Sequence, residues 1–288
     1  MSRIVYLNGE YLAQADAKIS VFDRGYLFGD GVYEVIPIIQ GKLVDEDYSV
    51  QRLRRSLAEI EISWPCSEAE YLQMLRELIS RNQVQEGMVY VQVTRGIAER
   101  DFSYPKNLKP SLMAYPTHKA ILNNPLAETG VSVVSTEDLR WKRRDIKSLN
   151  LLAQCMAKQQ AAKQGAYEAW MTEDGFVTEG GSSTAFIVKN NTVITRALSN
   201  SILPGVRRRV LVEMAERGGF KLEQRAFSIA EALAADEAFL SNASSLVLPI
   251  VSVDGHIIGD GKPGPVTRDL RARYIAALLA EASSKYYP

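Results

Sequence analysis

Histidine is scarce in this chain of 288 residues, which contains only His118 and His256. This count excludes a zinc site with two or three histidines, and both residues fall in stretches that resemble loops. A Ser-His-Asp or Cys-His enzyme would have to use one of these two histidines as its base. If the chain is an enzyme, we therefore expect Lys, Tyr, Asp or Glu to carry protons, and we expect no metal site.

Cysteine, net charge and long apolar runs are also lacking. Cys66 and Cys155 are too few for a disulfide framework, so we expect two free thiols. Basic and acidic residues number 34 each, and this balance disfavours a protein that binds nucleic acid by its overall charge. No run of about 18 apolar residues and no signal-peptide pattern occurs. We expect a cytoplasmic protein with neither a membrane nor a nucleic acid as partner.

The length predicts about two domains at the usual ~150 residues per domain. Strand-like and helix-like patterns are mixed in both halves, which indicates an α+β class. Periodicity fades from Tyr115 to Asn124, so we predict a domain at residues 1–117, a linker at 118–124 and a second domain at 125–288. The chain has no Gly-x-Gly-x-x-Gly turn within a βαβ series, which disfavours a dinucleotide-binding fold.

Several individual elements can be predicted. Apolar residues at Val50, Leu53, Leu57 and Ile60 predict a helix over 47–61, and Ser67 with Glu70 forms a capping box that starts another. Alternating valines predict a strand over 88–95. The second half is predicted to contain strands at 131–134 and 167–171, and a segment at 177–188 that passes through a turn into an apolar strand. It is also predicted to contain helices at 149–164, 206–217 and 266–282, and a short helix that starts at Ser228.

The densest charge cluster runs from Arg140 to Asn150, between a predicted strand and a predicted helix. One interpretation is a basic surface loop. Another is that one lysine acts as a Schiff-base nucleophile, which requires neighbouring cations and partial burial. Lys147 lies beside Ile146 and Leu149 and is therefore better placed for burial than Lys142. Both interpretations stay open on the cluster alone.

Three turns in the second half are suited to a phosphate-bearing ligand. Glu179 precedes a turn of small residues at 180–184, and residues 203–209 open a helix with Pro, Gly and three arginines. A further small polar turn covers 241–245 and could complete an anion nest. Plain hairpins and a solvated basic helix start are the alternatives. Together with a lysine, these turns suggest pyridoxal phosphate, whose ring nitrogen needs an acidic partner and whose phosphate needs N–H groups.

Three blocks at residues 23–35, 145–150 and 178–180 closely resemble the class IV pyridoxal-phosphate-dependent aminotransferases, and the resemblance covers nearly the whole chain. The run Gly29-Asp30-Gly31-Val32-Tyr33-Glu34 is most similar to the branch that acts on D-amino acids. The resemblance implies fold type IV, the two-domain α+β fold of the D-amino-acid aminotransferases. This fold has a small N-terminal α+β domain, a larger barrel-like C-terminal α+β domain, and a homodimeric assembly.

The resemblance also implies roles for individual residues. Lys147 would hold the cofactor as a Schiff base and move the proton, Glu179 would pair with the pyridinium nitrogen, and Arg52 would bind the phosphate. Other expected cofactor-binding residues are Ser183, Leu203, Gly205, Val206, Arg207, Asn242, Ala243 and Ser244.

Substrate binding is expected at Tyr33, Arg100, Phe102 and Ala243. The D-amino-acid branch binds the substrate carboxylate with a tyrosine, an arginine and a histidine. Tyr33 and Arg100 match the first two, but Phe102 stands where the histidine is expected. An arginine alone can still bind a carboxylate through two parallel hydrogen bonds.

The resemblance implies a transaminase that moves the amino group of a D-amino acid to a 2-oxoacid, such as 2-oxoglutarate or pyruvate, by a ping-pong mechanism. Because Phe102 adds apolar surface and removes a donor, an (R)-selective amine transaminase is the main alternative. A branched-chain aminotransferase and an aminodeoxychorismate lyase are further enzyme alternatives. A binding protein without the cofactor is the alternative from another functional class.

Overall fold

The computed structural model describes residues 2–285 and divides into two compact units. The first unit contains the chain up to Ala120, Ile146–Asn150 and the end of the last helix from Leu278. The second contains Ile121–Asp145 and Leu151–Ala277. The first boundary falls within the predicted linker, residues 118–124. The two short segments that return to the first unit were not part of the sequence prediction, which assumed a single division of the chain.

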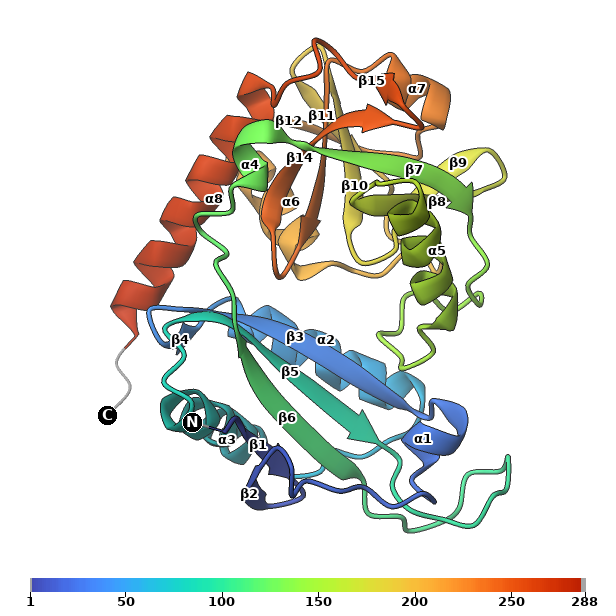
Figure 1. Ribbon diagram of the computed structural model, residues 1–288, viewed down its shortest axis with the longest axis vertical. Coiled ribbons are helices and arrows are strands. Elements are labelled where there is room, and N and C mark those ends of the chain that lie inside the picture. Colours follow the sequence, from blue (N-terminus) through green and yellow to red (C-terminus); the bar gives the residue numbers. More distant parts are fainter. Residues whose placement is uncertain (1, 286–288) are drawn as a thin grey trace. The chain divides into compact units, whose positions relative to one another are not determined.

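The described part of the first unit is built on an antiparallel six-stranded sheet in the order β2-β1-β6-β5-β3-β4 (Figure 1). Its elements are β1 (Ile4–Leu7), β2 (Glu10–Ala13), α1 (Arg24–Phe28), β3 (Gly31–Ile39), β4 (Lys42–Leu43), α2 (Glu46–Glu59), α3 (Glu68–Arg81), β5 (Glu86–Thr94) and β6 (Ser111–His118).

Helices α2 and α3 bury their apolar residues in the core of this unit. The α2 residues Val50, Leu53 and Leu57 are buried at the predicted spacing, and they pack with β3 residues such as Ile36. The capping box at Ser67 is confirmed: its side chain accepts from the Glu70 amide, and the Glu70 carboxylate accepts from the Ser67 amide. Local sequence therefore fixes where α3 starts, and burial of the apolar stripe attaches it to the sheet.

Strand β6 corrects one sequence prediction. Residues 115–118 were predicted to belong to a segment without periodicity, but they are the last four residues of β6. Tyr115 pairs with Tyr90 of β5, and Pro116 pairs with Val89. Pro116 and Thr117 obscured the alternation of buried and exposed residues that continues to this point.

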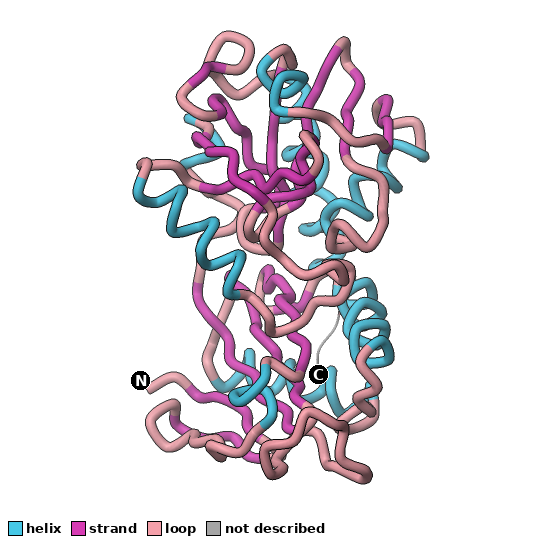
Figure 2. Tube along the Cα trace, turned by 90° about the vertical axis from the view of Figure 1, so that its right-hand side faces the viewer, coloured by secondary structure: helices cyan, strands magenta, loops and turns pink. Residues whose placement is uncertain are grey.

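The described part of the second unit has a nine-stranded mixed sheet, with the main order β12-β11-β10-β13-β14-β7-β8-β9 and β15 paired to β14. Strand β9, at one end of this order, also contacts β10, so the sheet curls towards a barrel (Figure 2, strands in magenta). Its strands are β7 (Val131–Glu137), β8 (Glu168–Glu173), β9 (Phe176–Gly180), β10 (Thr184–Lys189), β11 (Thr192–Thr195), β12 (Lys221–Gln224), β13 (Glu237–Asn242), β14 (Leu246–Val253) and β15 (His256–Ile257).

The second unit also contains α4 (Leu126–Thr129), α5 (Leu152–Lys163), α6 (Val206–Glu216), α7 (Ile229–Leu233) and the part of α8 (Pro265–Ser284) that extends to Ala277. The short helix expected after Ser228 is confirmed, and Ser228 caps it. The helix predicted from residue 149 instead starts at Leu152, because the preceding residues follow the edge of β3.

Within residues 2–285, none of the helices combines the length and apolarity that a membrane crossing requires. In the same range, no group of three or more His, Cys, Asp or Glu side chains is placed to hold a metal ion.

Candidate active site

Lys147 lies on the open edge of β3 in the first unit. The Tyr33 amide donates to the Lys147 carbonyl at 3.0 Å, the Leu149 amide donates to the Gly31 carbonyl at 3.0 Å, and Ser148 forms a bridge with Val32. The Lys147 amide also donates to Ser56 Oγ on α2 at 3.3 Å. These backbone contacts fix the lysine without using its side chain.

The Lys147 amine faces an aromatic ring. Its Nζ lies 4.1 Å from the centre of the Tyr33 ring, in the geometry of a cation–π contact. Tyr33 stacks on Tyr90, and Tyr90 stacks on Tyr115, so three adjacent strands each supply one ring. Burial, and to a lesser extent the two neighbouring tyrosines, raises the pKa of Tyr90 above its ordinary value, which keeps its hydroxyl neutral. The sequence prediction that Lys147 is less exposed than Lys142 is confirmed.

Arg52 is held by the next residue of β3. Successive side chains of a strand point to opposite faces, so Glu34 points into the core under α2, where it is completely buried. Arg52 Nε donates to Glu34 Oε1 at 2.7 Å, and Arg52 Nη2 donates to Oε2 at 2.8 Å. A buried carboxylate requires such a partner, and this pair fixes the guanidinium of the predicted phosphate ligand.

Arg100 and Phe102 lie on the loop between β5 and β6, next to α1 (Figure 1). The Arg100 guanidinium is 5.4 Å from the Phe28 ring and 5.3 Å from the Phe102 ring. Arg24 Nη1 donates to the Asp101 carbonyl at 2.5 Å, which ties the loop to α1. Among the described residues, no hydrogen bond or ion pair uses the Arg100 guanidinium. Its donors are therefore available for an anion.

Glu179 lies on β9 in the second unit, on the same face of the strand as the core residue Val177, and it is only 4% exposed. Its Oε1 accepts from the Leu203 amide at 3.0 Å and from Arg140 Nη1. Burial raises the pKa of Glu179, and the charge and hydrogen bond of Arg140, with the Leu203 amide, oppose that rise. No hydrogen bond from a described residue reaches Oε2.

The start of α6 packs closely against Thr184. Gly205 is its N-cap and supplies no side chain to cap the helix. A Cβ atom at Gly205 would lie 2.7 Å from Thr184 Oγ1, so only glycine fits here without displacing a neighbour. The amides of the first helical turn, which include Val206 and Arg207, form the kind of terminus that binds phosphate.

The remaining expected cofactor residues form the turn between β13 and β14. Asn242 Oδ1 accepts from the Ser244 amide at 3.1 Å and the Ser245 amide at 2.8 Å, so its side chain shapes the turn that contains Ala243. Thr184, next to Gly205, pairs with Ser241 at the base of this turn. Thr184 thus lies both beside the start of α6 and at the base of this turn.

Two expected cofactor residues have structural partners. Ser183 Oγ donates to the buried carboxylate of Glu168 at 3.2 Å. Arg207 is 3% exposed, and its guanidinium lies 5.9 Å from the Tyr274 ring. Because both side chains already have partners, we expect these two residues to bind the cofactor through their backbone groups. This contribution stays a prediction.

Sequence reasoning missed Arg140. Its side chain is only 5% exposed and contacts both Asp138 and Glu179, whereas the charge cluster around it was interpreted as a basic loop or a lysine site. The sequence contained one signal that Arg140 is held in place: Asp138 lies two residues before it, and an acidic residue at that distance can bind an arginine.

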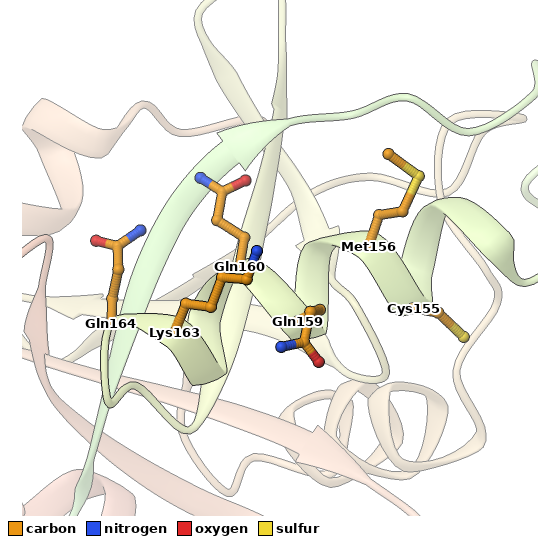
Figure 3. Close-up of a pocket in the computed structure, with 6 residues that line it drawn as sticks. All are labelled: Cys155, Met156, Gln159, Gln160, Lys163 and Gln164. Atoms are coloured by element: carbon orange, nitrogen blue, oxygen red, sulfur yellow. The ribbon is translucent and has the colours of Figure 1, made fainter.

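A pocket on the surface of the second unit lies elsewhere. It is lined by residues of α5 and the residue that follows it, and Figure 3 shows Cys155 and Met156 projecting from this helix. None of the residues that were expected to bind cofactor or substrate lines it. The candidate chemistry does not depend on this pocket.

The residues fit pyridoxal phosphate in their chemistry. Lys147 supplies an amine, Glu179 has a carboxylate oxygen that is not used by the described residues, and α6 starts at Gly205 without a side-chain cap on its amides.

Comparisons with known proteins agree with this chemistry. A family model described as "Amino-transferase class IV" matches residues 31–253. A D-alanine aminotransferase of Bacillus licheniformis is 40% identical over 281 residues, which cover 97% of this chain and 98% of that protein. A D-alanine aminotransferase of Staphylococcus aureus (strain MSSA476) is 40% identical over 268 residues, with 93% and 95% coverage.

Solved structures share the fold at lower identity. The branched-chain amino acid aminotransferase of Escherichia coli superposes with a TM-score of 0.91 at 22% identity and covers 99% of this chain and 98% of its own. The T.th. branched-chain enzyme with pyridoxamine 5'-phosphate has the same TM-score and identity, with 98% and 97% coverage. The expected fold type is confirmed, and the chain belongs to the class IV aminotransferases, which are pyridoxal-phosphate enzymes.

Proposed function

We propose that this enzyme transfers the amino group of D-alanine-like D-amino acids to a 2-oxoacid such as 2-oxoglutarate or pyruvate, in two half-reactions of a ping-pong cycle. The observation that carries the proposal is the contact between Lys147 and Tyr33, which places the amine beside a residue expected to bind substrate. Identity of 40% to D-alanine aminotransferases over nearly the whole chain supports the choice of D-amino acids.

When bound, pyridoxal phosphate supplies a reactive carbonyl carbon and a ring that withdraws electrons from the substrate α-carbon. Lys147 would hold the cofactor through its Nζ and would move the substrate α-proton. Glu179 would pair with the ring nitrogen through its carboxylate. The phosphate would be held by Arg52 and by amides at the start of α6 and in the turn after β13.

Arg100 would bind the α-carboxylate of the substrate. Its guanidinium has no hydrogen-bond or ion-pair partner among the described residues, and it lies beside the rings of Phe28 and Phe102, which contact each other. Tyr33 is expected to take part in the same recognition. The homodimer and the cytoplasmic location stay predictions that rest on the sequence.

The replacement of the family histidine by Phe102 favours a second candidate function, an (R)-selective amine transaminase. The Phe102 ring contacts Arg100 and Phe28 and adds apolar surface where a donor is expected. A donor substrate without a carboxylate would lose less binding free energy in this site than in a site that contains both an arginine and a histidine.

Steady-state turnover separates the two functions. The wild type and Arg100→Ala are each assayed with D-alanine, L-alanine and (R)-1-phenylethylamine as donors and 2-oxoglutarate as acceptor. The proposal expects the wild type to turn over D-alanine faster than L-alanine. It also expects Arg100→Ala to lower kcat/KM for D-alanine by about 100-fold, which is the loss expected for a charged hydrogen-bonded pair. Wild-type preference for the amine, unchanged in Arg100→Ala, would favour the second function.

A further inference from the structure

Arg140 connects two buried carboxylates in the second unit. Its Nη1 donates to Glu179 Oε1, while its Nε and Nη2 donate to the two oxygens of Asp138 at 2.9 and 2.7 Å. All three side chains are nearly inaccessible: Arg140 is 5% exposed, Asp138 0% and Glu179 6%. The planar guanidinium thus joins one carboxylate on each of its edges, which a lysine ammonium cannot do with the same geometry.

Asp138 is itself firmly held. Thr178 Oγ1 donates to Asp138 Oδ2 at 2.6 Å, and the Asp138 amide donates to the Thr172 carbonyl at 2.9 Å. The hydroxyl of Thr178, the residue that precedes Glu179, therefore anchors the aspartate that orients Arg140. The position of the guanidinium is fixed from the side opposite to Glu179.

A second arginine extends this cluster. Arg144 lies 3.5 Å from Asp138 and makes two hydrogen bonds of 2.7 and 2.8 Å to Glu173. Oε2 of Glu179 is an oxygen to which no described residue donates. A protonated ring nitrogen would supply a charged hydrogen-bond donor to this oxygen.

We propose that Arg140 is a positioning residue for pyridoxal phosphate that acts through Glu179. It fixes Oε1 together with the Leu203 amide, keeps the buried carboxylate charged, and leaves Oε2 directed to the ring nitrogen. Without Arg140, the cost of burying a charge favours a neutral Glu179, which no longer stabilises a protonated ring. This inference concerns the cofactor and does not depend on which amino donor the enzyme uses.

A double-mutant cycle on the cofactor-free protein tests the coupling. Wild type, Arg140→Met, Glu179→Gln and the double variant are titrated with pyridoxal phosphate, and the Kd is read from the quenching of tryptophan fluorescence. In the wild-type background, Arg140→Met is expected to raise the Kd at least about tenfold, because a buried carboxylate loses its cation. In the Glu179→Gln background, the same change is expected to raise the Kd by less than about threefold.

The protonation state of the ring nitrogen provides a second readout. With ¹⁵N-labelled pyridoxal phosphate, the NMR shift of the ring nitrogen is expected to be that of the protonated form in the wild type and to move to that of the neutral form in Arg140→Met. Arg225→Met is the matched control, because Arg225 also contacts two carboxylates, Glu223 and Glu231, but at the surface. It is expected to leave both the Kd and the NMR shift unchanged.

Equal losses of affinity in the two backgrounds would overturn the proposal, because Arg140 would then act independently of Glu179. An unchanged ring-nitrogen shift in Arg140→Met would overturn it as well. If Arg140→Met does not fold, Arg140→Lys takes its place in the cycle. Lysine keeps the charge but cannot hold both carboxylates. A loss of affinity for pyridoxal phosphate that occurs only in the background that retains Glu179 supports the proposal. An equal loss in both backgrounds, or no loss, contradicts it.

Discussion

Arg52 on α2 forms two parallel hydrogen bonds with Glu34 on β3, a carboxylate that is completely buried among the apolar residues of the first unit. The pair serves two purposes. It neutralises a charge that the core could not otherwise hold, and it fixes the guanidinium that we expect to bind the cofactor phosphate.

Arg52→Met should destabilise the protein in the absence of cofactor. It leaves the Glu34 carboxylate buried without its cation, and we expect the free energy of unfolding to fall by about 3–5 kcal/mol. Urea unfolding of the cofactor-free protein measures this value. Arg52→Met combined with Glu34→Gln should recover part of the loss, since the neutral amide is less costly to bury. A loss of less than about 1 kcal/mol in the single variant would mean that the pair does not compensate a buried charge.

Lys147→Ala should abolish the visible absorbance of the bound cofactor, because we propose that Lys147 Nζ is the amine that binds the cofactor covalently. The purified variant is expected to lack the absorbance band of the lysine-bound cofactor even after pyridoxal phosphate is added. Lys142→Ala is the control, as Lys142 lies in the same segment but is exposed. A Lys147→Ala variant that kept the band, or a Lys142→Ala variant that lost it, would remove the assignment.

The sequence predicted the elements whose signals are local. The stripe of α2 and the capping boxes at Ser67 and Ser228 depend on residues three or four positions apart, so one segment contains the whole signal. Lys147 and Glu179 were chosen from blocks that resemble a known family, and their roles stay predictions. The structure adds backbone partners that hold both residues in place.

The features that were missed depend on contacts between distant residues. The pairing of Arg52 with Glu34 requires the register of α2 on β3, which no local pattern encodes. The start of α5 was predicted too early, because Leu149 pairs with Gly31 instead of joining the helix. Arg140 was interpreted only as part of a basic cluster, because its buried contact is with Glu179 on β9, which is distant in the sequence.

Phe102 should support Arg100 through its aromatic ring. Phe102→Leu keeps apolar surface but removes the cation–π contact, so kcat/KM for D-alanine should fall about two- to fivefold. Phe102→His introduces a hydrogen-bond donor where the resemblance implies a histidine, and we expect it to raise the preference for D-alanine over (R)-1-phenylethylamine. Steady-state kinetics with both donors measure the two effects. If both variants matched the wild type on both donors, Phe102 would have no part in donor recognition.

Asp138 should contribute to stability in a manner that depends on pH. Burial alone would raise the pKa of Asp138, but the hydrogen bonds and charge of Arg140, with the Thr178 hydroxyl, lower it below its ordinary value. A lowered pKa stabilises the folded state above the unfolded pKa of about 3.9, and this stabilisation is lost as the pH falls through the lower folded value.

Urea unfolding of the wild type and Asp138→Asn over a range of pH tests this expectation. The wild type should be the more stable of the two near neutral pH, and the difference should shrink as the pH falls below about 4. A difference that stayed constant, or grew, on acidification would show that the charge of Asp138 is not what stabilises the fold.

The most direct test of the proposed activity is the first half-reaction without an acceptor. Holoenzyme is mixed separately with D-alanine, L-leucine and (R)-1-phenylethylamine, and the absorbance of the lysine-bound cofactor is followed. The account predicts that D-alanine alone converts the cofactor to its aminated form and releases pyruvate. Conversion by L-leucine alone would assign the enzyme to the branched-chain group, and conversion by the amine in preference to D-alanine would contradict a carboxylate-binding role for Arg100.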